Sequence, residues 1–405
     1  MSLPSRPRIA YVWDADYPWD VRTEKICRTL VDAGYDVDII ARNRQWRATD
    51  EVLAEGTVRR MPPWRLLGRS MDGALSFPAF ANPRWLWLLR QQFRARRPDA
   101  VIVRDLPLGP AALWIARAEG IPVLLDMAEN YPAMIRDVWN SGRAGRMDWL
   151  LRNPRAVEWV EQYLLPRVDH VITVVEESAE RVVAMGVPAG RVSVVSNTPP
   201  RARVVSTRAP RKPGPLRLTY LGLMEVPRGI REVLESAAAL QKEGRAFELL
   251  LIGDGRDRTQ FESYAQSLGL AAPTVRFTGA LPNAEALRLV GESDVGLVPH
   301  HAVESWNTTI PNKLFDYMAA GLVVVSSDAI PADRIVRSTG AGVVFRSRDS
   351  ADLTIQLRLL FDEAVRTRMA EAGMEAVRHR YNWEYDTAVL LRHLEACIRT
   401  PSASA

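Results

Sequence analysis

The residues best placed to do chemistry lie in one short stretch of the chain, from Thr308 to Gly321. A threonine at the cap, Pro311 at the first helical position and a glycine just beyond the last predict a helix of about two and a half turns. The backbone amides of its first turn, with the helix dipole behind them, would bind an anion. Lys313 adds a mobile positive charge, and Asp316 follows on the same face of the helix.

An ammonium group with a carboxylate one turn deeper fits a nucleoside diphosphate. The cation and the amides hold the phosphates, and the carboxylate accepts hydrogen bonds from the ribose diol. The alternative is an ordinary surface pair between Lys313 and Asp316, which contributes about 0.2–0.5 kcal/mol. Lysine is rare among the 53 basic residues, at Lys25, Lys212, Lys242 and Lys313 only, and this rarity favours a functional lysine.

Two glycine turns follow predicted strands in the same half of the chain. Gly222 permits a close approach of the backbone, and Arg228 stands near the start of the next predicted helix, where it can neutralise a diphosphate. A solvated arginine in a turn is the equally weighted alternative. Gly253, Asp254 and Gly255 form a second, tighter turn between a strand and a helix, which is a weak signal when taken alone.

Metal and nucleophile chemistry are disfavoured. His300 and His301 are adjacent, so an extended chain points them to opposite faces, and no nearby ligand spacing completes a metal site. Loop histidines of this kind are more often structural than substrate-binding. The sequence also contains no phosphate-binding Walker loop and no nucleophile elbow, which excludes most ATPases and hydrolases.

The alternation of strands and helices predicts an α/β fold with parallel sheets in two domains. In the first half, strands are expected at 8–13, 37–41, 100–103, 123–125 and 170–174, with helices at 21–33 and after Pro110. In the second half, strands are expected at 216–221, 247–252, 275–278, 294–299 and 322–326. We therefore assign residues 1–200 to the first domain, 201–215 to a linker, 216–376 to the second domain and 377–399 to a C-terminal helical segment.

The overall composition sets the broad class of the protein. A chain of 405 residues with 47% hydrophobic residues can build more than one core. Its two cysteines, Cys27 and Cys397, are too few and too scattered for a disulfide framework, which favours a reducing compartment. No apolar run reaches the roughly 18 residues of a membrane span, so a cytoplasmic protein is expected.

Residues 41–100 form a basic window that also carries four tryptophans. It contains twelve arginines and five acidic residues, together with Trp46, Trp64, Trp85 and Trp87. An anionic membrane surface is one interpretation of this composition, and it would make the protein peripheral on the cytoplasmic membrane face. The favoured interpretation is a helix over 83–97 whose apolar side faces the core. Nucleic acid is not expected, because no reader motif accompanies the arginines.

The chain resembles the retaining glycosyltransferases of family 4, with motifs concentrated in its second half. The corresponding segments are Tyr220-Leu221-Gly222 with Arg228-Gly229, Leu251-Ile252-Gly253-Asp254-Gly255, Val275-Arg276-Phe277-Thr278-Gly279, and the run from Pro311 to Gly321. Near the end, Tyr381-Asn382-Trp383-Glu384 resembles the segment that crosses back to the first domain. This resemblance implies the GT-B architecture, two Rossmann-like doubly wound domains that face each other across a cleft.

The resemblance also implies an activity: transfer of a sugar from a nucleotide-diphosphate sugar to a hydroxyl, with retention and without a cofactor or an essential metal. The acceptor would be a glycan, a lipid-linked saccharide or a small metabolite, bound by the first domain. On the donor side the implied residues are Gly222, Arg228, Gly253, Asp254, Phe277, Thr308, Thr309, Asn312, Lys313 and Asp316. On the acceptor side they are Asp20, Arg22, Asp126 and Asn130. Arg228 and Lys313 would stabilise the leaving diphosphate, and Glu129 would orient or deprotonate the acceptor hydroxyl.

Two departures keep other functions open. Many family members carry histidine where this chain has Ala128, and the first carboxylate of the family's paired-glutamate motif would fall at Thr308. These changes favour a second hypothesis, a GT-B partner protein that binds nucleotide without transferring sugar. A nucleotide-sugar epimerase is the third and least favoured.

Overall fold

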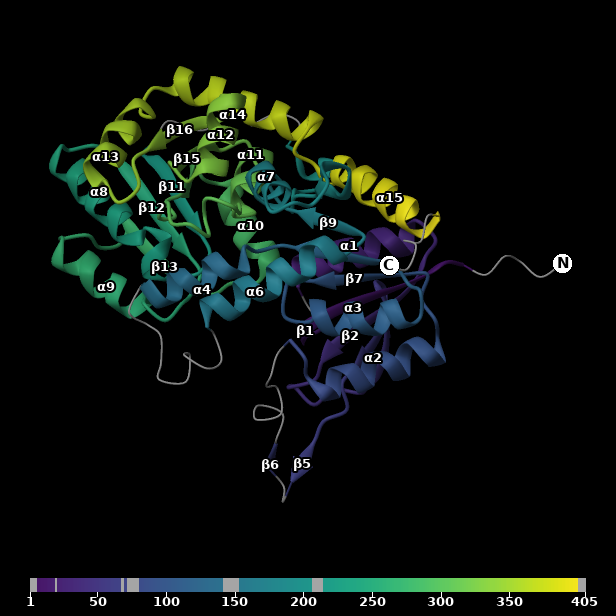
Figure 1. Cartoon of the computed structure of the whole chain (residues 1–405). Coiled ribbons are helices and arrows are strands. Elements are labelled where there is room, and N and C mark those ends of the chain that lie inside the picture. The colour runs from purple at the N-terminus through teal and green to yellow at the C-terminus, as the bar shows by residue number, and fades with distance from the viewer. Residues whose placement is uncertain are drawn as a thin grey trace. The chain divides into compact units, whose positions relative to one another are not determined.

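The chain folds into two compact units (Figure 1). One contains Met1–Ser196 with Asp386–Ala405, and the other contains Asn197–Tyr385. The computed structural model describes residues 6–18, 20–66, 69–70, 80–140, 153–205 and 214–399. Each unit is built on a parallel sheet covered by helices, which confirms the predicted α/β class.

The first unit contains an eight-stranded sheet in the order β10-β9-β8-β7-β1-β2-β4-β3. All neighbours in it are parallel except β3, which pairs antiparallel with β4 at the edge. Its strands are β1 (Arg8–Asp16), β2 (Asp36–Arg42), β3 (Asp50–Leu53), β4 (Gly56–Arg60), β7 (Ala100–Arg104), β8 (Val123–Met127), β9 (His170–Thr173) and β10 (Val192–Val194). A short hairpin pairs β5 (Arg65–Leu66) with β6 (Arg69–Ser70).

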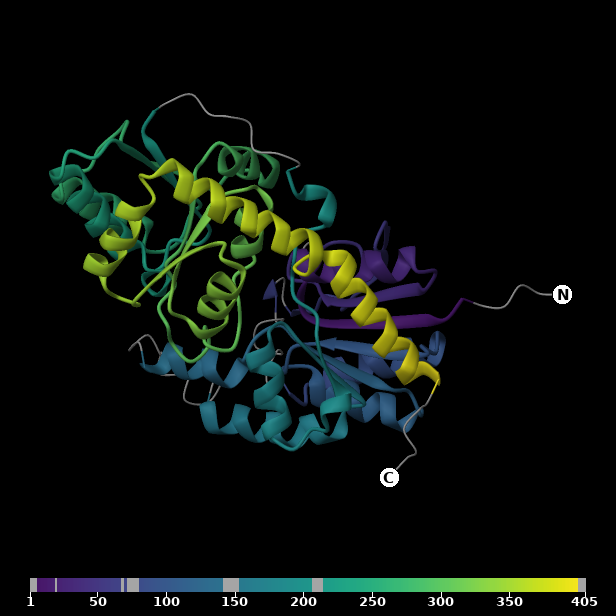
Figure 2. The same cartoon turned by 90° about the horizontal axis from the view of Figure 1, so that it is seen from above.

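Helices connect these strands on both faces of the sheet (Figure 2). The helices are α1 (Val21–Asp32), α2 (Pro83–Ala95), α3 (Gly109–Ala118), α4 (Tyr131–Asn140), α6 (Pro154–Leu164) and α7 (Glu176–Ala184). From β1 to β2 the chain moves toward one edge of the sheet. From β7 through β8 to β9 it moves toward the opposite edge. Because parallel crossovers are right-handed, α1 covers one face, and α3 and α6 cover the opposite face.

The interior of the first unit matches the predicted apolar pattern in most places. On α2, Trp85, Leu88, Leu89 and Phe93 are buried, which confirms the expected core-facing side of that helix. The strand predicted at 8–13 ends too early, because β1 continues to Asp16. The polar end of this strand is stabilised by pairing with β2, where the Arg42 guanidinium lies 2.5 Å from the Asp14 carboxylate.

The second unit contains a six-stranded, all-parallel sheet in the order β13-β12-β11-β14-β15-β16. Its strands are β11 (Leu216–Leu221), β12 (Phe247–Ile252), β13 (Val275–Gly279), β14 (Val295–Val298), β15 (Val323–Ser327) and β16 (Gly342–Phe345). Its helices are α8 (Ile230–Lys242), α9 (Arg258–Ser267), α10 (Asn283–Gly291), α11 (Lys313–Ala319), α12 (Ile330–Thr339), α13 (Ser350–Leu359) and α14 (Glu363–His379). This is the strand order of a doubly wound Rossmann sheet.

The last helix, α15 (Trp383–Arg399), begins in the second unit, and its part from Asp386 onward belongs to the first. In the first unit, the ring of His393 on α15 stacks on that of His170 at 4.4 Å. The boundary after Ser196 precedes the predicted linker at 201–215, of which 206–213 lie outside the described residues. Among the helices that the structure describes, none is long and apolar enough to cross a membrane.

Candidate active site

The second sheet has one place where ligand-binding residues are expected to gather. Its strand order reverses between β11 and β14, because the chain leaves these neighbouring strands toward opposite edges. Open parallel sheets bind ligands beyond the carboxyl ends of such strands. Gly222 follows β11 there, and Pro299 and His300 follow β14.

Helix α11 is fixed against these two strands by Tyr317. A Cβ atom added to Gly296 of β14 would lie 2.2 Å from ring atoms of Tyr317, so only glycine leaves room for this ring. The Tyr317 hydroxyl accepts a hydrogen bond of 2.8 Å from the backbone amide of Leu221, the last residue of β11. These contacts place Lys313, one turn earlier, at the carboxyl end of β11.

The predicted start of this helix was wrong. α11 begins at Lys313 rather than Pro311, and its cap residue Asn312 makes no side-chain capping hydrogen bond. The amides of Leu314 and Phe315 donate to the carbonyls of Pro311 and Asn312, at 3.1 and 3.0 Å. Because these two first-turn amides already donate to backbone carbonyls, they do not form the anion site that the sequence predicts for them.

The ammonium of Lys313 is packed rather than mobile. It lies 4.0 Å from the centroid of the Tyr220 ring, and a Cβ atom at Gly222 would approach it to 2.6 Å. Gly222 therefore makes room for the lysine, in a backbone conformation with φ of 145° that glycine adopts easily. Burial and the positive charge of Arg228 lower the pKa of the Lys313 ammonium well below its ordinary value.

Arg228 is held by two side chains that the sequence did not connect with it. Its Nη1 lies 3.0 Å from Nε2 of His300, and its guanidinium lies 4.7 Å from the centroid of the Trp306 ring. Arginine only donates, so Nε2 accepts and the proton of the imidazole lies on Nδ1. Burial, followed by the charges of Lys313 and Arg228, lowers the pKa of His300 and keeps the ring neutral.

The turn that carries Arg228 is attached to the end of β14. Gly229 has a φ of 70°, and a Cβ atom there would lie 1.8 Å from the carbonyl oxygen of Pro299. The amide of His301 donates to the carbonyl of Pro227 at 3.0 Å, and its ring pairs with the Glu232 carboxylate at the same distance. His300 therefore contacts the turn before α8, through Arg228. His301 contacts the same turn through its backbone amide and the first turn of α8 through its ring.

The remaining predicted donor residues have diverse positions. Gly253 packs on the other glycine turn, since a Cβ atom there would lie 2.0 Å from the Gly222 carbonyl oxygen. Asp254 is exposed, and Phe277 packs against the core of this unit. Asp316 is partly exposed in the first turn of α11. Thr308 donates back to the carbonyls of Glu304 and Ser305 and Thr309 is buried, so neither threonine caps α11.

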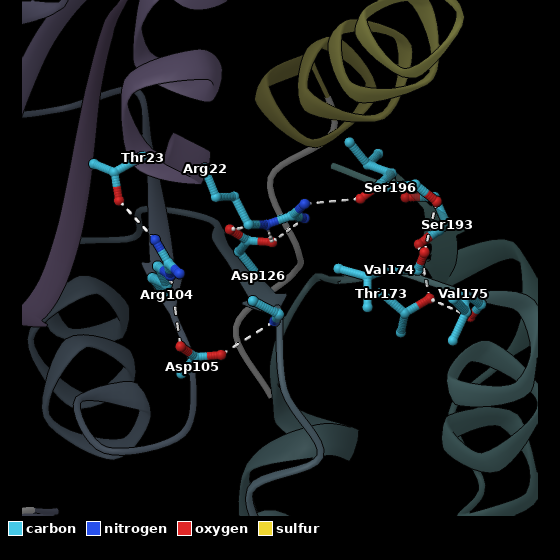
Figure 3. A network of polar contacts seen from close by, with 12 residues as sticks. Arg22, Thr23, Arg104, Asp105, Asp126, Thr173, Val174, Val175, Ser193 and Ser196 are labelled. Carbon is cyan, nitrogen blue, oxygen red and sulfur yellow. Dashed lines mark hydrogen bonds and ion pairs between the residues drawn. The ribbon is translucent and has the colours of Figure 1, made fainter. Parts of the chain in front are cut away.

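In the first unit, the predicted acceptor-side residues Arg22 and Asp126 bind each other (Figure 3). Nε of Arg22 on α1 donates to Asp126 at the end of β8 at 2.9 Å, and both side chains are buried. Tyr11 of β1 donates to the same carboxylate at 3.1 Å, and Arg22 also donates to the carbonyl of Val195 at 2.9 Å. This buried ion pair ties together β1, α1, β8 and the end of β10.

A second polar group lies at the switch point of the first sheet, between β1 and β7. Arg104, the last residue of β7, pairs with Asp20, the N-cap of α1. Asp105 follows with a φ of 59°, uncommon for a non-glycine residue, and accepts a hydrogen bond of 3.1 Å from the amide of Ala128. Burial raises the pKa of Asp105 to about 6, although the nearby Arg104 opposes this shift. Neither Arg104 nor Asp105 belongs to a motif that was recognisable in the sequence.

The candidate acceptor carboxylate, Glu129, lies in the loop between β8 and α4 and is exposed. Its neighbour Asn130 is buried and accepts a hydrogen bond from the amide of Ala133, the third residue of α4. Asn130 therefore stabilises the start of this helix. Among the residues that the structure describes, no three His, Cys, Asp or Glu side chains are grouped to hold a metal ion.

Comparisons with known proteins agree with this arrangement. Residues 20–198 match the family described as "Glycosyl transferase 4-like domain", and residues 215–363 match "Glycosyl transferases group 1". Together these matches cover most of the chain. The first covers most of the first unit, and the second covers most of the second unit. The chain belongs to the group 1, family 4 glycosyltransferases. The family assignment made from the motifs is therefore confirmed.

Two curated relatives illustrate the similarity. This chain is 24% identical to a glycogen synthase of Mycobacterium tuberculosis over 294 residues, which cover 72% of this chain and 67% of that protein. It is 32% identical to a phosphatidyl-myo-inositol mannosyltransferase of Mycobacterium leprae over 178 residues, 44% of this chain and 45% of that protein. The aligned part thus spans less than half of the mannosyltransferase.

Solved structures extend the similarity to nearly the whole chain. A sucrose-phosphate synthase from Thermosynechococcus elongatus matches with a TM-score of 0.74 and 17% identity, covering 97% of this glycosyltransferase and 100% of that chain. The Anabaena protein HepE in complex with UDP matches with a TM-score of 0.68 and 12% identity, covering 96% and 100%. At these identities the likeness shows the fold, and it supports the GT-B architecture.

Proposed function

We propose that this glycosyltransferase moves a hexosyl group from a nucleotide-diphosphate sugar to a hydroxyl acceptor with retention of configuration. The observation that carries the proposal is the convergence of Arg228 and Lys313 at the switch point of the second sheet. Within the described part of the chain, their close partners are rings: Tyr220 for the lysine, and His300 and Trp306 for the arginine.

Two cations packed this way favour an anionic ligand. The lowered pKa of Lys313 shows that its positive charge is disfavoured by burial and by Arg228. A diphosphate placed between them would relieve the repulsion and restore the charge of the ammonium. As the bond from sugar to phosphate breaks, negative charge grows on the leaving diphosphate, and fixed cations stabilise that charge in the transition state.

The other donor-site roles follow the same geometry. Asp316 lies one turn beyond Lys313 on α11, and we assign its carboxylate to the ribose hydroxyls of the nucleotide. UDP bound to HepE, which shares this fold, supports a nucleotide as the ligand. Because Arg228 and Lys313 supply the positive charge, transfer is proposed to need no metal ion.

Two carboxylates are candidates for activating the acceptor hydroxyl. Glu129 follows β8 and is exposed, so a substrate can reach it. Asp105 lies at the switch point of the first sheet, exposes 15% of its side chain and has a pKa of about 6, which suits a general base near neutral pH. The acceptor is a glycan, a lipid-linked saccharide or a small metabolite, and the activity belongs to polysaccharide biosynthesis or a related pathway.

Donor hydrolysis in the absence of acceptor tests the proposal without knowledge of the acceptor. The protein is incubated with single nucleotide sugars, and the anomeric proton of the released sugar is followed by NMR before it mutarotates. A retaining enzyme releases the α-sugar first from an α-linked donor. Release of the β-sugar first would refute retention. Binding of nucleotide without any turnover would instead support a non-catalytic partner, and conversion of one nucleotide sugar into another would support an epimerase.

A further inference from the structure

Four tryptophans are exposed in the described part of the first unit, and three of them lie on helices. Trp87, Trp114 and Trp159 expose 55%, 42% and 66% of their area, respectively. Indole rings carry the largest apolar surface of any side chain, and exposing several on one face is unfavourable in water. Their gathering on one face therefore indicates an interaction surface.

The three tryptophans share one face because their helices are neighbours. Trp87 lies on α2, Trp114 on α3 and Trp159 on α6, and α3 contacts both other helices (Figure 1). On each helix the tryptophan stands on the side opposite to the buried residues, so it points away from the sheet. We call this surface the α2-α3-α6 face.

Aromatic contacts join two of these helices into a continuous patch. Nε1 of Trp114 donates to the hydroxyl of Tyr163 at 3.0 Å, and the Trp159 ring stacks on the Tyr163 ring at 5.8 Å. The guanidinium of Arg167 covers the same tyrosine at 4.2 Å. The patch therefore combines indole rings with positive charge at contact distance.

The charged residues of the α2-α3-α6 face are mostly positive. Helix α2 carries Arg84, Arg90 and Arg94 and no acidic residue, and Arg117 is the only charged residue of α3. Helix α6 carries Arg155, Glu158 and Glu161. The acidic residues of α6 are engaged, since Glu161 is buried against Arg181 and Glu158 pairs with Arg136.

We propose that the α2-α3-α6 face docks on an anionic lipid bilayer. Indole rings prefer the interfacial layer of a bilayer, where their apolar part is buried and their N–H group reaches polar groups. Arginines beside them pair with lipid phosphates and hold the protein to a negative surface. The basic window at 41–100 contributes α2 with Trp87 to this face, whereas Trp85 of the same helix faces the core. The other two tryptophans lie outside that window, on α3 and α6.

Vesicle binding by the full chain tests this surface independently of sugar transfer. Sedimentation is measured with vesicles of phosphatidylcholine alone and with vesicles that contain phosphatidylglycerol. We expect binding to the anionic vesicles only, with an affinity that falls as salt rises. Absence of binding to anionic vesicles, or equal binding to neutral ones, would overturn the proposal.

Charge and aromatic variants locate the contact. Arg90→Glu with Arg155→Glu should weaken partitioning about tenfold or more. Lys242→Glu with Arg276→Glu is the matched control, because these exposed residues of the second unit give the same change in net charge. If both double variants lose the same amount of vesicle binding, the net charge of the protein causes the binding, and the α2-α3-α6 face does not.

Trp87→Ser with Trp159→Ser should weaken partitioning by a similar factor. Ile355→Ser with Leu359→Ser on α13 is its control, since these two side chains are about equally exposed. Circular dichroism checks that all variants fold. If the tryptophan variant binds vesicles as wild type does but turns a dimer into a monomer by light scattering, the face contacts a second copy of the chain and the proposal fails.

Discussion

His300 should control the affinity for nucleotide through Arg228. The imidazole accepts a hydrogen bond of 3.0 Å from this guanidinium, whose other described contact is the face of Trp306. A hydrogen bond with a charged partner contributes about 1.5–3 kcal/mol. If Arg228 loses its orientation with this bond, His300→Ala should lower the affinity for a nucleoside diphosphate by about tenfold to a hundredfold.

Isothermal titration with UDP, and with GDP and ADP in parallel, measures this loss in a double-mutant cycle. Because His300 acts through Arg228, His300→Ala should have no further effect in an Arg228→Ala background. His300→Gln keeps an oxygen near the position of Nε2 and should recover most of the affinity. His300→Asn places its oxygen nearer the position of Nδ1 and should recover little.

Two results would refute this explanation. One is that His300→Ala lowers the binding free energy by the same amount, within about 0.5 kcal/mol, in the wild type and in the Arg228→Ala variant. The other is His300→Gln behaving like His300→Ala. As a control, His300→Ala combined with Asp316→Ala should be additive, because Asp316 is assigned to the ribose rather than the phosphates.

The shifted pKa values of Asp105, Lys313 and His170 should make transfer, nucleotide binding and stability depend on pH. If Asp105, whose pKa is about 6, is the acceptor base, transfer at low substrate should rise with pH through about 6. Asp105→Asn should then abolish this rise and Glu129→Gln should keep it, whereas the reverse pattern would favour Glu129. Because the pKa of Lys313 is lowered in the ligand-free protein, nucleotide binding should take up protons and weaken as pH rises, and titration in buffers of different ionisation enthalpy would show this. The pKa of His170 is lowered to about 3, mainly by burial and further by His393 and Arg191. The unfolded chain takes up this proton below about pH 6.5 and the folded chain does not, so stability is lost as pH falls toward 3, by about 1.4 kcal/mol per pH unit. His170→Gln should reduce that slope by this amount in urea unfolding.

The sheets were predictable because their strands are continuous apolar runs between clear breaks. β11 and β12 have the predicted bounds, Leu216–Leu221 and Phe247–Ile252. The extension of β1 to Asp16 was missed because the sequence there is polar, and the strand is stabilised by a partner, Arg42, that only the fold supplies.

The start of α11 was mispredicted because several cap-forming residues precede it. Thr308, Thr309 and Pro311 each match a helix start, but the Thr308 hydroxyl bonds backward to the turn at Glu304 and Ser305. Local sequence does not show which of these competing hydrogen bonds a threonine makes.

The contact between Arg228 and His300 was beyond sequence reasoning for a different reason. The two residues are 72 positions apart and meet because β11 and β14 are neighbours in the sheet. Strand order is a property of the whole fold, so a motif search finds Arg228 and Lys313 separately and leaves out the histidine and tryptophan that hold the arginine.

The central claim is that the residues after β11, the end of β14 and the start of α11 form a site for a nucleoside diphosphate. Calorimetric titration of the wild type, Lys313→Ala and Asp316→Ala with UDP, GDP and ADP tests it most directly, with circular dichroism to confirm that each variant folds. We predict binding of at least one of the three nucleotides to the wild type and an affinity about tenfold or more lower in each variant. Unchanged affinity in both variants would contradict the claim.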